Sequence, residues 1–257
     1  MGVGIDDVDA RLERAKENIA NLASEIKELL QDGCDERAFP ARFTALAGES
    51  IYLMRSALDH LAWHLVVAAG GEPGPRTAFP VFALDPARNA GSLVTYAACV
   101  AGMSDSAKVR IERLQPYHRH GLRKQNVLWI LNDLSSTDQH TALALRINTY
   151  PKQRNRPFRT GETLQDGPSA DGNGARSIAG SRRGAAATHG NSQDGEGAAY
   201  LSFVRFGKLT DVGVVDGLWL LWHATHGIYA SFAEELADAL SRSEDRDESD
   251  AIRQTGQ

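Results

Sequence analysis

The N-terminal thirty residues carry apolar side chains at alternating spacings of three and four, with Glu, Arg, Lys and Asn between them. The apolar positions are Ile5, Val8, Leu12, Ala15, Ile19, Leu22, Ile26 and Leu29. This spacing is that of one narrow face of an α-helix. Such a face is typical of a helix that packs nearly parallel or antiparallel to another helix. The pattern therefore predicts a long N-terminal helix that ends at Gly33.

A second helix is predicted from about Ala41 to Ala69, closed by Gly70 and Gly71. Its apolar face has the same spacing and consists of Ile51, Met54, Leu58, Leu61 and Leu65. The other side of this helix is apolar as well, at Tyr52, Trp63 and Val67. A helix that is apolar nearly all round belongs in the middle of a bundle, so we expect this one to be central and to pair antiparallel with the first.

Shorter elements follow the second helix. Helices are predicted at about 92–100, 105–114 and 125–134, and the segments TALALRINTY and AYLSFVRFG alternate as strands do. The nearly fifty residues between those strands are rich in Gly, Ser, Arg and Ala and hold few large apolar groups. Such a composition predicts a disordered insertion at the tip of a hairpin. A long final helix is predicted from about Val214 to Ser241, with the apolar face Val215, Leu218, Trp222, His226, Tyr229, Ala233, Leu236 and Leu240.

These elements predict a mainly α fold: a helical bundle with a long N-terminal helical hairpin, a long C-terminal helix and a small two-stranded β element. Residues 1–150 would form the bundle and the first strand, and residues 151–198 the disordered insertion. Residues 199–241 would form the second strand and the C-terminal helix on the same bundle, and residues 242–257 a charged flexible tail.

The composition favours a cytoplasmic protein. The N-terminus lacks the basic and apolar regions of a secretory signal, and Cys34 and Cys99 fit neither a CxxC motif nor a disulfide framework. The longest apolar stretch near the C-terminus is interrupted by Asp216, His223 and His226, so we expect no membrane span. A net charge of −5 gives no overall basic field for nucleic acid, and an RNA site would have to be local.

Four polar side chains stand within the apolar stretch LMRSALDHLAWHLVVAA of the second helix: Arg55, Asp59, His60 and His64. Arg55 and Asp59 are four residues apart on one flank of its apolar face, and His60 and His64 are four apart on the opposite flank. Unpaired charges in such a place cost several kcal/mol, on the order of 3–5 when a buried partner is missing. One interpretation is that all four are structural: Arg55 pairs with Asp59, and each imidazole finds an acceptor. The protein would then be a non-catalytic structural or partner-binding helical protein, its partner unknown.

The spacing of Arg55 and His60 also resembles the R-x4-6-H motif of the HEPN superfamily. These are compact all-helical domains, many of them metal-independent ribonucleases of toxin and defence systems. The resemblance implies RNA as the substrate, a homodimer whose cleft unites Arg and His from two protomers, and no cofactor. It departs from the family pattern at Ser56, where Asn, Asp or His is preferred. In this interpretation His60 acts as acid or base and Arg55 holds the phosphate. On a regular helix the two lie about 140° apart, so a dimer cleft or a distorted helix would have to unite them.

A second resemblance concerns the order of four segments, RSALDHLAWHL, FPVF, LQPYH and LWILNDLSSTDQH. It is similar to an order found in uncharacterised bacterial proteins, in which the last segment ends in Asp-Lys-His. Here that segment ends in Asp138, Gln139 and His140. The resemblance implies no activity, but it adds Asp133, Asp138 and His140 as supporting partners for the site.

A metal site is the third interpretation. His60 and His64 place two imidazoles on one helical face, as in zinc sites, and His226, Asp138 or His140 could supply a third ligand. Helical bundles of the DinB type bind a divalent metal such as zinc through three histidines. The segment HLAWH lacks the catalytic Glu of HExxH. In each interpretation we expect His60 or His64 to contact a carboxylate or an imidazole of residues 130–140 or of the C-terminal helix.

Overall fold

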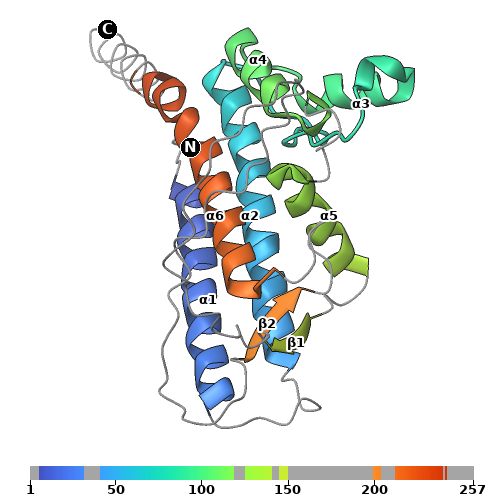
Figure 1. Cartoon of the computed structure of the whole chain (residues 1–257). Helices are drawn as coiled ribbons and strands as arrows, with labels where there is room; N and C mark the ends of the chain where they lie inside the picture. The colour runs from blue at the N-terminus through green and yellow to red at the C-terminus, as the bar shows by residue number, and fades with distance from the viewer. Residues whose placement is uncertain are drawn as a thin grey trace, which may run out of the picture. The chain divides into compact units, whose positions relative to one another are not determined.

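The computed structural model of the 257-residue chain describes residues 6–31, 41–118, 125–140, 145–149, 199–203, 212–239 and 241. These residues are mainly helical, as predicted (Figure 1). The predicted disordered insertion at 151–198 and the predicted tail at 242–257 lie outside the described residues. The described residues up to Asn148 and from Ala199 onward belong to one compact unit.

The described part of the chain contains six named α-helices and two short strands, together with two 3-10 turns and a helical segment at 233–239. The helices are α1 (Asp6–Gln31), α2 (Ala41–Ala68), α3 (Ala90–Cys99), α4 (Asp105–Leu114), α5 (Val127–His140) and α6 (Val214–Ser231). Two 3-10 turns, η1 (Pro86–Arg88) and η2 (Pro116–His118), precede α3 and follow α4. The strands β1 (Leu145–Thr149) and β2 (Ala199–Phe203) pair in a two-stranded sheet, as predicted. None of the described helices is both long and apolar enough to cross a membrane.

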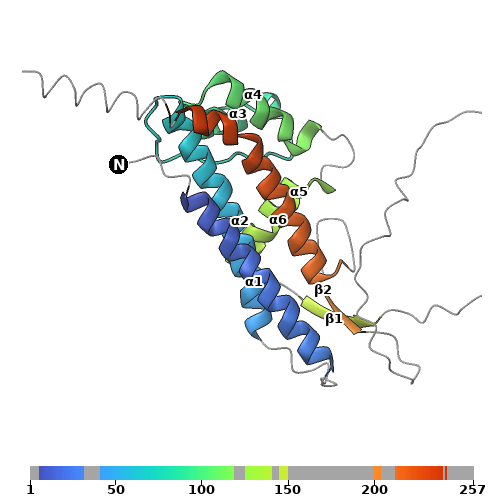
Figure 2. The ribbon, with the colours of Figure 1, turned by 90° about the vertical axis from the view of Figure 1, so that its left-hand side faces the viewer.

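The predicted helical hairpin is formed by α1 and α2, which lie side by side along their length (Figures 1 and 2). The predicted apolar face of α1 is buried from Val8 to Ile26, and Leu29 packs at its edge. Near the start of α1, Val8 and Leu12 pack on Ala57 of α2. A methyl group at position 57 lets the two helices approach closely at this level. This approach decides which polar groups of α1 can reach α2.

The central helix is α2, which contacts α1, α5 and α6. Its five predicted core residues are all at most 1 % exposed. The prediction that its other side is covered as well is wrong for Tyr52 and Trp63, which remain 58 % and 46 % exposed. The three neighbouring helices leave one face of α2 open within the described structure. The helix therefore has a buried side, two polar flanks and an exposed aromatic face.

The end of α2 follows the predicted glycine cap. Gly70 has φ +77°, the Gly71 N–H donates to the Val66 carbonyl at 2.9 Å, and the Gly70 N–H donates to the Val67 carbonyl at 2.8 Å. This pair of bonds satisfies two terminal carbonyls of α2 and ends the helix.

The predicted continuous C-terminal helix is wrong in one respect, because α6 ends at Ser231. Phe232 forms a turn, and residues 233–239 are helical again. Arg110 of α4 donates to the Ser231 carbonyl, and its guanidinium lies over the Phe232 ring, 5.1 Å from the centroid. A side chain that occupies a helix carbonyl is a known cause of helix breaks. The break lets Phe232 and Leu236 be buried.

His226 also departs from its prediction, since it is exposed instead of lying on the buried face of α6. Its ring stacks on Trp222, with 5.0 Å between centroids. Trp222 is buried and donates its indole N–H to the Leu12 carbonyl of α1 at 2.8 Å. Trp222 therefore contributes to the contact between α6 and α1.

The close approach at Ala57 can be tested by enlarging the side chain. We expect Ala57→Leu to lower the free energy of unfolding by about 1–3 kcal/mol, because the added atoms must push α1 away from α2. Urea unfolding followed by circular dichroism measures this loss. Ala45→Leu is the matched control, because Ala45 is exposed on the same helix. Equal stability of the two variants would show that α1 does not approach α2 closely at this point.

Candidate functional site

The polar side chains of α2 form two separate clusters on different sides of the helix. In the first, Arg55 and Asp59 hold the main chain of Phe79. Arg55 Nη2 donates to the Phe79 carbonyl at 2.9 Å, and the Phe79 N–H donates to Asp59 Oδ1 at 3.0 Å. The predicted ion pair is present, with Arg55 Nη1 2.9 Å from Asp59 Oδ1, although the two are not aligned as a hydrogen bond. Together they clasp both main-chain groups of one residue.

In this first cluster Arg55 and the Phe79 ring are largely withdrawn from solvent, whereas the Asp59 side chain is 38 % exposed. The Arg55 side chain is 17 % exposed, and the Phe79 ring is fully buried in the core. Burial raises the pKa of the Asp59 carboxyl above its ordinary value, against the opposing effects of the Arg55 guanidinium and the Phe79 N–H. The pair anchors the segment that follows α2, because it binds both main-chain groups of Phe79. Gln115 continues this role by donating to the Pro80 carbonyl at 2.9 Å and accepting from the Phe82 N–H at 3.0 Å.

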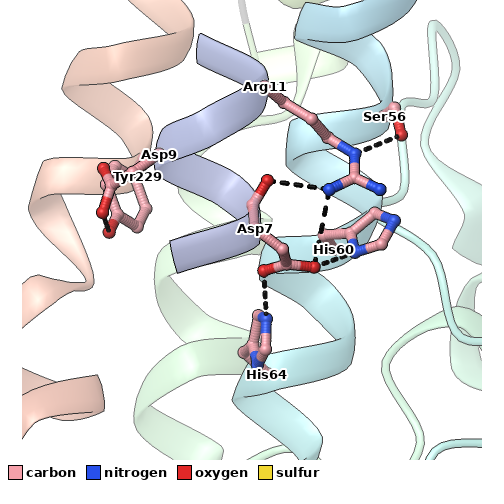
Figure 3. Close-up of polar contacts among 7 residues, drawn as sticks. All are labelled: Asp7, Asp9, Arg11, Ser56, His60, His64 and Tyr229. Atoms are coloured by element: carbon pink, nitrogen blue, oxygen red, sulfur yellow. Dashed lines mark hydrogen bonds and ion pairs between the residues drawn. The ribbon is translucent and has the colours of Figure 1, made fainter. Parts of the chain in front are cut away.

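The second cluster joins α1 to α2 through one carboxylate, that of Asp7 (Figure 3). His60 Nδ1 hydrogen-bonds to Asp7 Oδ2, and His64 Nε2 hydrogen-bonds to Asp7 Oδ1 at 2.8 Å. An ionised carboxylate only accepts hydrogen bonds, so both ring nitrogens carry a hydrogen. Asp7 thus fixes the orientation of two imidazoles one helical turn apart.

Arg11 completes this cluster from the next turn of α1. Its Nη1 donates to the Asp7 carbonyl at 2.7 Å and lies 3.6 Å from Asp7 Oδ2. Its Nε donates to the Ser56 hydroxyl at 3.1 Å. Figure 3 shows the guanidinium between Asp7 and Ser56, beside the His60 ring. The cluster therefore brings together a carboxylate, two imidazoles, a guanidinium and a hydroxyl.

The two imidazoles differ in their surroundings. The His64 side chain is 5 % exposed, and its Nδ1 is buried without a hydrogen-bond partner within the described structure. The His60 side chain is 38 % exposed, and no described residue contacts its Nε2 through a hydrogen bond. His64 is thus a buried structural group, whereas the free nitrogen of His60 is open to a ligand.

The electrostatics of Asp7 favour its ionised form. Burial raises the pKa of this carboxyl, but hydrogen bonds from His64 and His60, with their positive charge when protonated, hold it below its ordinary value. Nearby, Tyr229 of α6 donates to Asp9 Oδ2 at 3.0 Å and ties α6 to the same end of α1 (Figure 3). The first turn of α1 is therefore bonded to both helices on which it packs.

The structure does not unite Arg55 with His60 within one chain. Arg55 bonds to the Phe79 segment, whereas His60 bonds to α1, so their partners lie on different sides of α2. The described partner of the two histidines was not expected from the sequence. A carboxylate does bond to both imidazoles, but it comes from α1 and not from residues 130–140 or α6.

The remaining candidates lie apart from this cluster or outside the description. The side chains of Asp138 and His140 lie outside the described residues, and the Asp133 carbonyl accepts from Thr137 at 2.7 Å. His226 stacks on Trp222. Among the described residues, no group of three His, Cys, Asp or Glu side chains is placed to hold a metal ion.

Sequence reasoning missed Asp7, Arg11 and the main chain of Phe79. Asp7 and Arg11 are four apart on the first predicted helix and close to its apolar positions Val8 and Leu12. That spacing predicts that the two side chains lie side by side on one helix, but it does not show which neighbouring helix they face. The main chain of Phe79 leaves no signal in the sequence, because every residue except Pro offers the same two groups.

Comparison with models of known families, with curated proteins and with solved structures finds no match for this chain.

The Phe79 anchor predicts a specific loss of stability. We expect Arg55→Ala to lower the free energy of unfolding by about 2 kcal/mol, because Asp59 and the Phe79 carbonyl lose a charged partner. In an Asp59→Asn background the same substitution should cost less, since the two side chains act as a pair. Denaturant unfolding of the wild type, the two single variants and the double variant measures these differences in free energy. Arg14→Ala is the control, because Arg14 is an exposed ion-pair residue on α1. Equal losses for Arg55 and Arg14 would contradict the anchor.

The lowered pKa of Asp7 predicts how stability depends on pH. A carboxyl whose pKa is lower in the folded state stabilises the protein above its unfolded value, about 3.9, and loses this effect as pH falls through the folded value. The difference in unfolding free energy between wild type and Asp7→Asn should therefore be largest above about pH 4 and shrink in more acidic solution. Unfolding in urea over this range measures it, with the fully exposed Asp105 as the Asn control. A difference that stays constant with pH would show that Asp7 is not held ionised.

Proposed function

We propose that the chain is a metal-independent ribonuclease in which His60 is the general base and Arg11 binds the phosphate. One observation carries this proposal: Asp7 holds His60 through Nδ1, while no described residue bonds to Nε2 of this ring, which is 38 % exposed. A carboxylate on one nitrogen of an imidazole fixes its tautomer and stabilises the imidazolium that forms when the other nitrogen takes a proton. This is the arrangement of a general base.

RNA is the substrate class that suits this set of groups, because its 2′-hydroxyl is an internal nucleophile. His60 Nε2 would take the proton of the 2′-hydroxyl, and the 2′ oxygen would form a bond to phosphorus. The bond from phosphorus to the 5′ oxygen would break, and this oxygen would take a proton from solvent. The products are a 2′,3′-cyclic phosphate and a 5′-hydroxyl. The protein has to supply only a base and a cation for the phosphorane charge.

Arg11 is the cation beside His60 in this proposal, in place of Arg55. Its guanidinium shares the carboxylate of Asp7 with His60, and its Nε bonds to Ser56. Arg55 of the HEPN-like motif is held by Asp59 and Phe79 and has little exposed surface. In this proposal His60 has the catalytic role that the HEPN resemblance implies, whereas Arg55 has a structural role.

A second candidate is a non-catalytic structural or partner-binding helical protein. It is favoured by the observation that Arg55, Asp59, His60 and His64 all bond to groups of their own chain. Each cluster ties a different segment to α2, which is sufficient reason for polar residues in this helix.

An RNA-cleavage assay with the His60→Asn variant separates the two candidates. The Asn amide can replace Nδ1 and keep the bond to Asp7, but it cannot take up a proton. We expect unchanged stability and a loss of cleavage of at least about 100-fold, and cleavage by wild type that survives EDTA. Arg11→Ala should also lose cleavage, and the exposed His226→Asn should retain it.

The outcomes of this assay are distinct. No cleavage by folded wild-type protein would reject the ribonuclease and favour the second candidate. Cleavage that persists in His60→Asn, prepared in the same way, would show that the activity does not belong to this site. Cleavage lost in Arg55→Ala but retained in Arg11→Ala, both folded, would return the phosphate role to Arg55.

A further inference from the structure

Helix α3 turns an apolar face toward solvent. Ala90, Leu93, Val94 and Ala97 are all exposed, with Leu93 at 48 % and Val94 at 62 %. Their spacing of three, one and three places them on one side of the helix. This is the pattern by which a helix normally packs on another helix. In α3 it faces away from its own chain within the described structure.

The opposite side of α3 is the one that is attached. The Tyr96 ring packs edge-on against Phe82, with 5.7 Å between centroids, and the Ala78 N–H donates to the Cys99 carbonyl at 3.5 Å. No residue of α3 is fully buried. Figure 1 shows α3 to the side of the bundle formed by α1, α2 and α6. The helix is thus held along one edge, and its apolar face is left without a described neighbour.

The order of side-chain sizes on this face reads the same in both directions. It runs small, large, large, small, as Ala90, Leu93, Val94 and Ala97. Two copies of such a face fit together when the helices run antiparallel about a two-fold axis between positions 93 and 94. Leu93 of each copy then lies against Val94 of the other, and Ala90 lies against Ala97. A two-fold interface requires this kind of self-complementarity.

The absence of charge on this face also favours pairing with a second copy of the chain. No charged residue occurs between Ala90 and Cys99, so two copies bring no like charges together along the contact. An acidic or basic partner would find no counter-charge on this face. Antiparallel helices also place the N-terminus of one helix dipole beside the C-terminus of the other.

We propose that α3 is a self-association surface through which two copies of this chain pair antiparallel, face to face. The interface is short, well below the standard size of about 1,600 Å². We therefore expect a weak, concentration-dependent dimer. This inference is independent of the His60 site, which lies on α1 and α2.

Sedimentation velocity of the full chain over a range of concentrations tests the proposal. Wild type should shift from monomer to dimer as concentration rises. Leu93→Glu or Val94→Lys alone should abolish the shift, because each places a charge against an apolar side chain. The double variant should restore it, since the introduced carboxylate of one copy then faces the introduced ammonium group of the other. Val109→Glu, at a position 50 % exposed on α4, is the control and should dimerise as wild type does.

Three outcomes would overturn the proposal. One is a monomeric wild type at every concentration, which would mean that another group covers α3. Another is a dimer that Leu93→Glu and Val94→Lys leave intact. The third is a double variant that stays monomeric while circular dichroism shows a native helix content, since antiparallel pairing demands the rescue.

Discussion

The carboxylate of Asp7 is the interaction on which the arrangement of α1 and α2 depends. It accepts from imidazoles at two successive turns of α2 and lies next to the Arg11 guanidinium of its own helix. Apolar contacts are not directional, so the apolar stripe of α1 restricts the register of the two helices only through the sizes of its side chains. A carboxylate that must meet two imidazoles has only one acceptable register. The apolar residues thus drive the association, and Asp7 selects its alignment.

Both polar clusters of α2 solve the same physical problem in different ways. A polar group withdrawn from water has to be bonded, or it destabilises the fold. Arg55 and Asp59 bond to the main chain of Phe79, whereas His60 and His64 bond to the side chain of Asp7 on α1. In the first cluster both main-chain groups of Phe79 are bonded, whereas in the second no described residue bonds to the exposed Nε2 of His60. This difference makes one cluster an anchor and the other a candidate site.

The helices and their buried faces were accessible from the sequence, because spacings of three and four persist over α1 and α2. The Arg55–Asp59 ion pair was accessible too, since a spacing of four on a helix brings side chains together. The partner of the histidines was not. His60 lies off the row of Leu and Ile, yet α1 reaches it because Ala57 leaves room. Periodicity does not show where two helices cross, and so it does not show which small residue matters there. It also does not show that Arg110 bonds to the carbonyl at the end of α6.

The clasp around Phe79 has a consequence for which sequences this fold tolerates. Arg55 and Asp59 recognise the peptide groups at position 79 and make no bond to its side chain. Any apolar residue that fills the pocket can therefore stand there without disturbing the clasp. Proline cannot, because it has no N–H to offer Asp59. Pro80 favours an extended conformation at residue 79. The main chain there is therefore restricted before Arg55 and Asp59 bond to it. Two neighbouring requirements thus oppose each other: proline is suitable at position 80 and prohibited at position 79.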